Sequence, residues 1–138
     1  MRERVAAARV GRLATLGAEG RPHLVPICFA LDGDTLYSAV DEKPKRSKRL
    51  RRLENIRRRP KVAVLVDHYE EDWSRLWWVR LDGLARVVAE GAEREHGLAL
   101  LQAKYEQYGA EPPTGPVLAI RIERWRGWSS AAQQKALR

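Results

Sequence analysis

Short runs of alternating or continuous apolar residues, separated by Gly, Pro and Asp, recur along the chain and predict a mainly β fold. Such runs indicate strands at residues 10–16, 21–31, 35–40, 61–67, 75–88 and 117–125. The turns at 17–20 and 32–34 are short enough to join the first three strands as hairpins. Hairpin connections favour an antiparallel sheet, and six strands in 138 residues predict a small six-stranded antiparallel barrel with flanking helices.

Two of these strands contain residues whose position is constrained. Proline has no backbone N–H, so Pro26 is expected on an edge strand or at a bulge. Gly83 interrupts the strand over 75–88 and predicts a bulge there. Trp77 and Trp78 are consecutive and therefore point to opposite faces, which places one in a core and the other at a site or an interface.

Helical spacing occurs in three segments. Residues 2–9 predict a short helix. Residues 92–108 predict a longer one with the apolar stripe Leu98, Leu101, Tyr105 and Tyr108. A third helix is expected between Pro44 and Pro60, because proline suits a first helical turn and ends a helix elsewhere.

The segment over residues 43–61 concentrates the positive charge of the chain. It contains eleven Lys or Arg and one Glu, a local charge of about +10, whereas the whole chain carries +8. The remaining residues therefore sum to about −2, and the basicity is local. A segment of this kind predicts a binding site for an anion.

On a helix, this basic segment separates into two stripes. At about 100° per residue, Leu50, Leu53 and Ile56 share a narrow arc that is expected to be buried. A second stripe, on the far side of the helix, is expected from Lys48, Arg52, Asn55 and Arg59. A solvated polar face is the ordinary alternative, but like charges four residues apart repel each other, and only Glu54 relieves that repulsion.

Length and composition limit the class of protein. The chain is expected to form a single domain over 1–138 with a large share of surface, so a partner subunit would be unsurprising. The single cysteine, Cys28, excludes a disulfide framework and a cysteine metal site. No apolar run has membrane-spanning length and no signal-peptide core is present, which predicts a cytoplasmic protein without membrane contact. The high charge leaves nucleic acid, an anionic cofactor or an acidic partner open.

The chain lacks the common catalytic motifs. It has no Gly-rich phosphate loop, no Rossmann fingerprint and no metal-ligand spacing, and the acidic residues at 67–72 are expected to form a solvated loop, with no metal. His23 is expected to be a histidine with satisfied polar atoms, and a polar contact at a pocket is the alternative. If the protein is an enzyme, a cofactor therefore supplies the chemistry.

Five motifs in a fixed order resemble a known family. They are Gly20-Arg21-Pro22-His23-Leu24-Val25-Pro26, Asp32-Gly33-Asp34-Thr35-Leu36-Tyr37, Arg52-x-x-Asn55, Pro60-Lys61-Val62 and Trp77-Trp78-Val79-Arg80-Leu81-Asp82-Gly83. From about residue 10 to residue 128, the chain resembles the FMN-binding split-barrel proteins, whose best-known members are the pyridoxine 5′-phosphate oxidases. Within that superfamily it is most similar to the PPOX-class branch of enzymes dependent on coenzyme F420, an 8-hydroxy-5-deazaflavin.

The resemblance implies a homodimeric six-stranded split barrel with one cofactor in each of two clefts at the subunit interface. It assigns phosphate binding to Tyr37, Ser38, Arg51, Arg52 and Asn55, with Arg52 in the place of the lysine usual in the family. The cofactor ring is expected against Val25, Pro26 and Ile27. The expected walls of the cleft are Trp77 or Trp78, together with Trp125 or Trp128 from a second subunit.

One departure from the family pattern bears on the cofactor. Residues 39–50 are longer than the same loop in the FMN oxidases. Their cations include Lys43, Lys45, Arg46 and Lys48. Coenzyme F420 has a phosphodiester and an oligoglutamate tail, so a polycationic run beside the phosphate site suits it better than FMN, which is the alternative cofactor.

Four functions follow from these observations. The resemblance implies an F420-dependent oxidoreductase that transfers hydride between the deazaflavin C5 and a small organic substrate. A non-catalytic carrier of F420 would share every binding residue. An FMN-dependent pyridoxamine phosphate oxidase-like enzyme is a weaker interpretation, because the basic residues that grip pyridoxine phosphate cannot be placed in the sequence. Nucleic-acid binding is also weaker, because residues 43–61 contain no aromatic side chain on which bases could stack.

Overall fold

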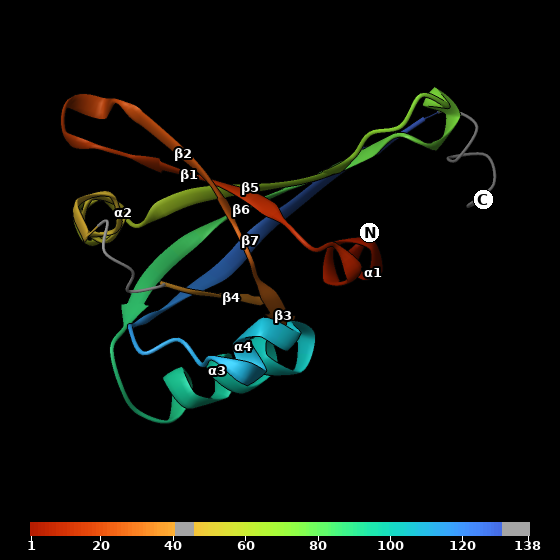
Figure 1. Cartoon of the computed structure of the whole chain (residues 1–138). Helices are drawn as coiled ribbons and strands as arrows, with labels where there is room; N and C mark the ends of the chain where they lie inside the picture. Colours follow the sequence, from red (N-terminus) through yellow and green to blue (C-terminus); the bar gives the residue numbers. More distant parts are fainter. Residues whose placement is uncertain (41–45, 131–138) are drawn as a thin grey trace.

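The computed structural model describes residues 1–40 and 46–130, with the side chains of 1–40 and 51–130. Its centre is a curled antiparallel sheet with the strand order β2-β1-β5-β6-β7-β4-β3 (Figure 1). The strands are β1 (Gly11–Leu16), β2 (Pro22–Ile27), β3 (Ala30–Asp32), β4 (Thr35–Ala39), β5 (Lys61–His68), β6 (Trp77–Val88) and β7 (Val117–Ser129). The predicted mainly β, antiparallel barrel is confirmed, with seven strands in place of six.

The additional strand arises where one strand was expected over residues 21–31. The backbone N–H of Phe29 donates to the Tyr105 hydroxyl (3.1 Å), and the Phe29 carbonyl accepts from the same hydroxyl. These groups are therefore satisfied outside the sheet, and the chain divides into β2 and β3 around them. β2 pairs with β1 and β3 with β4, so the two halves lie at opposite edges of the sheet. Pro26 lies on the edge strand β2, as its missing N–H predicts.

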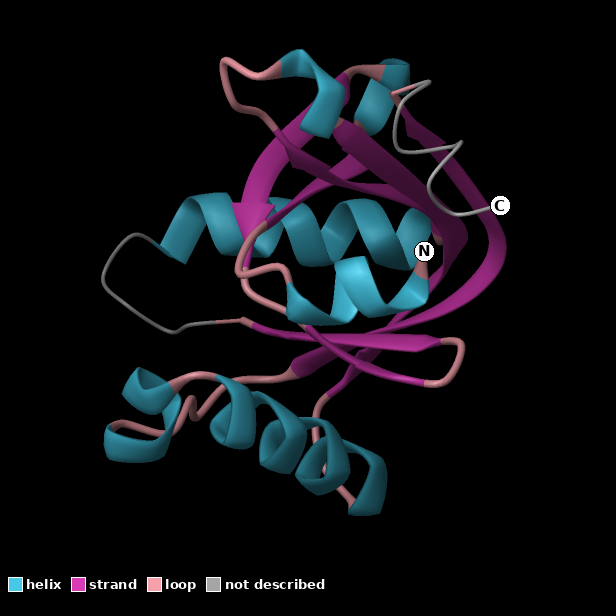
Figure 2. Cartoon of the chain, turned by 90° about the vertical axis from the view of Figure 1, so that its right-hand side faces the viewer, coloured by secondary structure: helices cyan, strands magenta, loops and turns pink. Residues whose placement is uncertain are grey.

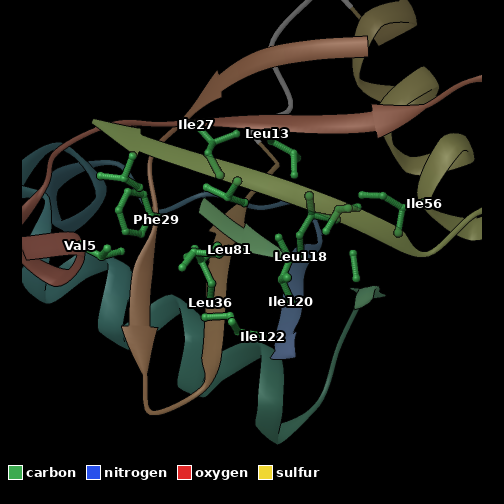
Figure 3. Close-up of a cluster of buried hydrophobic side chains, with 14 of the residues drawn as sticks. Val5, Leu13, Ile27, Phe29, Leu36, Ile56, Leu81, Leu118, Ile120 and Ile122 are labelled. Atoms are coloured by element: carbon green, nitrogen blue, oxygen red, sulfur yellow. The ribbon is translucent and has the colours of Figure 1, made fainter. Parts of the chain in front are cut away.

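Apolar side chains from the inner face of the sheet fill the barrel (Figure 3). Alternate residues of each strand point inward, and those at the centre, Leu13, Val64, Leu81, Leu118 and Ile120, are fully buried. The helix α1 (Arg2–Ala7) closes one end of the barrel with Val5, and α2 (Arg46–Arg58) closes the other with Leu53 and Ile56. In Figure 2, which looks along the barrel, α1 lies in front and α2 behind.

Two further helices lie outside the barrel. α3 (Ala92–Lys104) packs on β3, β4 and β7, and α4 (Glu106–Ala110) packs on α3. One helix was expected over residues 92–108, but Tyr105 has extended backbone angles (φ −118°, ψ 115°) that break it. This conformation directs the Tyr105 hydroxyl to the backbone of Arg9 and Phe29. Gly97 brings α3 close to the sheet, since a Cβ there would lie 2.8 Å from the ring of Tyr37.

The strands β5, β6 and β7 continue past the core as an arm that points away from α2 (Figure 1). Pairing extends to His68 opposite Trp77 and to Trp77 opposite Ser129, so β7 continues beyond the end expected at residue 125. A 3-10 turn, η2 (Trp73–Arg75), lies at the tip of the arm, and another, η1 (Ala18–Gly20), joins β1 to β2. The register of β6 shifts between Asp82 and Gly83, which confirms the predicted bulge.

Candidate functional site

The polar side of α2 lies against the end of the β1–β2 hairpin. Asn55 is only 6% exposed, and its amide donates to the buried Thr15 hydroxyl at 3.2 Å. One turn later, the Arg59 guanidinium donates to the Gly17 carbonyl at 2.6 Å. The prediction that Asn55 lies on a stripe away from the core was therefore wrong, whereas Arg59 is exposed and Arg52 is half-buried. α2 is covered by the barrel on one side and by this hairpin on the next, so its buried arc is wider than its apolar stripe.

Arg51 and Arg52 extend the same surface of α2 toward β2. Arg51 is exposed and Arg52 is half-buried. Burial lowers the pKa of His23 below its ordinary value of 6.5, and the charges of Arg52 and Arg51 lower this pKa further. Thr15 pairs with His23 and also accepts the hydrogen bond from Asn55, so His23 lies beside α2. Arg51 forms no ion pair with the described part of the chain. This arrangement is one that an anion would stabilise.

His23 itself is not the satisfied histidine that the sequence predicted. It lies on β2 opposite Thr15 and is half-buried. Its Nδ1 atom is buried and has no hydrogen-bond partner among the residues described. Buried polar atoms are nearly always paired, so this atom requires an explanation.

The predicted ligands of the F420 tail cannot be placed. Lys43 and Lys45 lie outside the described residues. Arg46 and Lys48 belong to the start of α2, but their side chains lie outside the described part of the chain. Their role remains a prediction.

Tyr37 and Ser38 serve the fold of β4. Tyr37 is buried beneath α3, where its hydroxyl donates to the Glu93 carboxylate at 3.2 Å and burial raises its pKa. Ser38 is 1% exposed, and its hydroxyl donates to the Cys28 carbonyl at 2.8 Å. Both hydroxyl hydrogens are therefore used within the chain.

The three residues predicted to lie under the cofactor ring do not share one face. Val25 and Ile27 point inward and pack in the core. Pro26 is exposed on the opposite face, beside Leu24, which is 66% exposed. A ring lying on the outside of β2 would therefore contact Pro26, with Val25 and Ile27 behind it.

The outer face of the sheet, on β2, β1, β5, β6 and β7, presents a group of exposed apolar side chains. They are Leu16, Leu24, Leu65, Trp78 and Trp128. Trp78 lies opposite Trp128 on the neighbouring strand. Toward the arm, these two rings, Leu65 and Arg80 line an open pocket of about 360 Å³. We refer to this set of five residues as the outer apolar face.

Trp77 and Trp125 point inward, so the prediction that Trp77 and Trp78 face opposite ways is confirmed. Trp77 packs against the core and stacks on His68, with ring centroids 6.4 Å apart. The Trp125 indole donates to Asp34 at 3.2 Å, and the Arg2 guanidinium lies 4.5 Å from its ring centroid. Trp78 and Trp128 are therefore the tryptophans that the barrel leaves available on its outer face.

The two parts of the predicted site lie at opposite ends of β5 (Figure 1). β5 begins beside α2 at Lys61, and Asp67 near its other end pairs with Trp78. Six residues at about 3.3 Å each separate these positions by roughly 20 Å. Within one chain, Arg51 and Arg52 therefore do not share a cleft with Trp78.

The acidic segment at the tip of the arm is held by local contacts. His68 and Arg75 both contact Glu70, and Asp72 accepts a hydrogen bond from the Ser74 backbone. Over the described ranges, no three His, Cys, Asp or Glu side chains are grouped in a way that would hold a metal ion. None of the helices in those ranges is both long enough and apolar enough to span a membrane.

A curled antiparallel barrel closed by a basic helix is the split-barrel class of fold. Residues 1–129 match the family model described as pyridoxamine 5′-phosphate oxidase. The chain therefore belongs to the pyridoxamine 5′-phosphate oxidase family, as its motifs predicted.

The individual proteins that resemble this chain share only part of its sequence or have low sequence identity to it. A 5a,11a-dehydrotetracycline/5a,11a-dehydrooxytetracycline reductase of Streptomyces rimosus is 37% identical over 57 residues, which cover 41% of this chain and 39% of that protein. A conserved hypothetical protein of Mycobacterium tuberculosis has a TM-score of 0.77 at 21% identity, covering 96% of this chain and 84% of that one. An FAD-binding protein of Mesorhizobium loti has a TM-score of 0.70 at 24% identity, covering 91% and 89%. The two solved structures establish a common fold.

Proposed function

We propose that this protein is an oxidoreductase dependent on coenzyme F420, with the cofactor phosphate bound by Arg51 and Arg52 of α2. The observation that carries the proposal is the pair of arginines beside His23, on a helix with seven Lys or Arg and one Glu. Membership of the pyridoxamine 5′-phosphate oxidase family supports a flavin-like cofactor, and the reductase from Streptomyces rimosus supports redox chemistry.

The donor groups present fit an anionic cofactor. Two guanidinium groups can form charge-assisted hydrogen bonds to a phosphate, each contributing roughly 1.5–3 kcal/mol. Asn55 and Arg59 hold α2 against the β1–β2 hairpin and so fix the position of the arginines. The cations of residues 43–50 suit the oligoglutamate tail, and this suitability favours F420 over FMN.

Bound F420 would supply hydride transfer at C5 of its ring, and the chain would orient the ring and exclude water. Pro26 and Trp78 on the outside of the sheet offer flat apolar contact for the ring and a small organic substrate. Val25, Ile27 and Trp77 support these positions from the core side. Tyr37, Ser38 and Trp125 act in this proposal by holding the strands on which the site depends.

A homodimer completes this site. The outer apolar face is unusual for a surface in contact with water, and the arginines and Trp78 lie too far apart within one chain. A two-fold dimer through this face would bring the arm of one subunit toward α2 of the other, because the two features lie at opposite ends of the molecule. Each cleft would then combine arginines from one subunit with tryptophans from its partner.

Mutation of the arginines tests the phosphate site. Arg52→Ala should weaken F420 binding by about 2 kcal/mol, roughly thirtyfold, and Arg51→Ala should have an effect of similar size. Arg57→Ala is the matched control, because Arg57 is exposed on another side of α2 and should leave the dissociation constant unchanged. Equal affinity for wild type, Arg51→Ala and Arg52→Ala would remove both residues from the site.

Turnover separates an enzyme from a carrier, which would use the same binding residues. The assay follows oxidation of reduced F420, by the return of its absorbance, in the presence of a panel of small organic electron acceptors. Hydride transfer to at least one acceptor is expected. Tight binding without turnover on any acceptor would favour the non-catalytic carrier.

A further inference from the structure

His23 lies on β2 beside α2, and the proposed phosphate site does not use its side chain. Its ring lies opposite Thr15 on β1, and the Thr15 hydroxyl is already engaged by the Asn55 amide of α2. The charged groups that act on the ring are Arg52 and Arg51, both from α2. The Nδ1 atom is buried without a partner, whereas Nε2 is not among the buried atoms that lack one.

The environment of Nδ1 determines where the imidazole holds its hydrogen. A neutral imidazole has one N–H donor and one lone-pair acceptor, and a charged imidazole has two donors. A hydrogen on Nδ1 would be a buried donor with no acceptor, and this holds both for the Nδ1–H tautomer and for the charged ring. Repulsion from two arginines adds to the cost of the charged ring. The neutral form with its hydrogen on Nε2 leaves only a lone pair unpaired at Nδ1, which is less costly than an unpaired N–H, and it places the donor on the nitrogen that is not buried without a partner.

We infer that His23 is a neutral hydrogen-bond donor, through Nε2–H, to the anionic group that Arg51 and Arg52 bind. The inference rests on the proposed anion site. It adds to that site a donor that discriminates between anions by the position of their oxygen atoms. The arginines attract any anion, because their charge acts at a distance. A single uncharged N–H at a fixed place favours anions with an oxygen acceptor at the matching position, such as a phosphate ester.

Two near-isosteric variants test this role of His23. The side-chain amide nitrogen of glutamine can occupy the position of Nε2, whereas that of asparagine reaches only as far as Nδ1. The probes are F420 and inorganic phosphate, titrated into wild type, His23→Gln and His23→Asn. His23→Gln should stay within about threefold of the wild-type affinity for each probe, and His23→Asn should lose about tenfold. Equal losses in both variants, or retention by asparagine only, would overturn the inference.

A measurement on the wild-type protein guards against variants that merely unfold. Nitrogen-15 NMR of the imidazole reports the tautomer directly, and the ring should be neutral with its hydrogen on Nε2 at pH 7. Addition of phosphate should shift the Nε2–H resonance. A charged ring, an Nδ1–H tautomer or an unmoved resonance would each refute the role. Failure of F420 to bind while phosphate gives the expected pattern would overturn the cofactor assignment and leave His23 as the donor.

Discussion

At the scale of single residues, a few close contacts decide where the strands lie. The bulge in β6 is the clearest case, because Gly83 faces the backbone of β7. A Cβ at this position would lie 2.4 Å from the carbonyl oxygen of Arg121, a distance that real Cβ atoms do not adopt. The strands would have to move apart to admit any side chain.

Gly83→Ala should therefore destabilise the protein by about 1–3 kcal/mol, the usual cost of overpacking. Gly109→Ala is the control, since the nearest heavy atom to its Cβ would be 4.0 Å away and alanine favours the helix in which it lies. Urea unfolding of both variants should show a loss for the first and no loss for the second. Equal midpoints would show that the strands can yield at the bulge.

The hydrogen bond between Asn55 and Thr15 is expected to stabilise the fold. Because its amide is buried against Thr15, Asn55→Ala should reduce the free energy of unfolding by about 1–2 kcal/mol. The combined change with Thr15→Val should cost less than the sum of the two single changes, because the pair would be removed together. Strict additivity in urea unfolding would show that the two side chains do not depend on each other.

At the scale of elements, α3 is held to the barrel by a polar contact that depends on pH. Glu93 of α3 accepts two hydrogen bonds from Arg86 at 2.9 Å and one from the Tyr37 hydroxyl. The bonds from Arg86 lower the pKa of Glu93 below its ordinary value of 4.5, against the smaller opposing effect of burial. As pH falls below 4.5, the unfolded chain therefore takes up a proton at this position before the folded one does.

The stabilising effect of Glu93 should accordingly be complete above about pH 4.5 and be lost as the pH falls through its pKa in the folded protein. Unfolding midpoints of wild type and Glu93→Gln, measured across this range, should converge on acidification because glutamine does not titrate. Two curves that stay parallel would show that Glu93 contributes nothing specific to the docking of α3.

Most elements could be predicted from the sequence, and the exceptions share a cause. Strand alternation, the bulge at Gly83 and the edge position of Pro26 are local properties, and the structure confirms them. The division of residues 21–31 and the break at Tyr105 both depend on bonds between Phe29 and Tyr105, which are far apart in the sequence. The buried position of Asn55 and the unpartnered Nδ1 of His23 likewise depend on how α2 meets the β1–β2 hairpin. Helical periodicity contains no information on such a contact.

At the scale of the whole molecule, the outer apolar face predicts self-association. Leu65 and Trp78 belong to this face and are 39% and 36% exposed. Leu65→Glu should place a charge in the proposed interface, so light scattering should find a dimer for wild type and a monomer for the variant. Gln107→Glu on α4, which packs on α3 and lies away from this face, should remain a dimer. A monomeric wild type at micromolar concentration would count against the interface.

Direct binding measurements distinguish F420 from FMN as the cofactor of this protein. Purified wild-type protein is titrated with F420, with a deazaflavin that has the same ring but no oligoglutamate tail, and with FMN, at low and high salt, and binding is followed by fluorescence. F420 should bind most tightly, and its advantage over the tail-less compound should decrease with salt, because exposed charges are screened. Tighter binding of FMN than of F420, at either salt concentration, would contradict F420 as the cofactor.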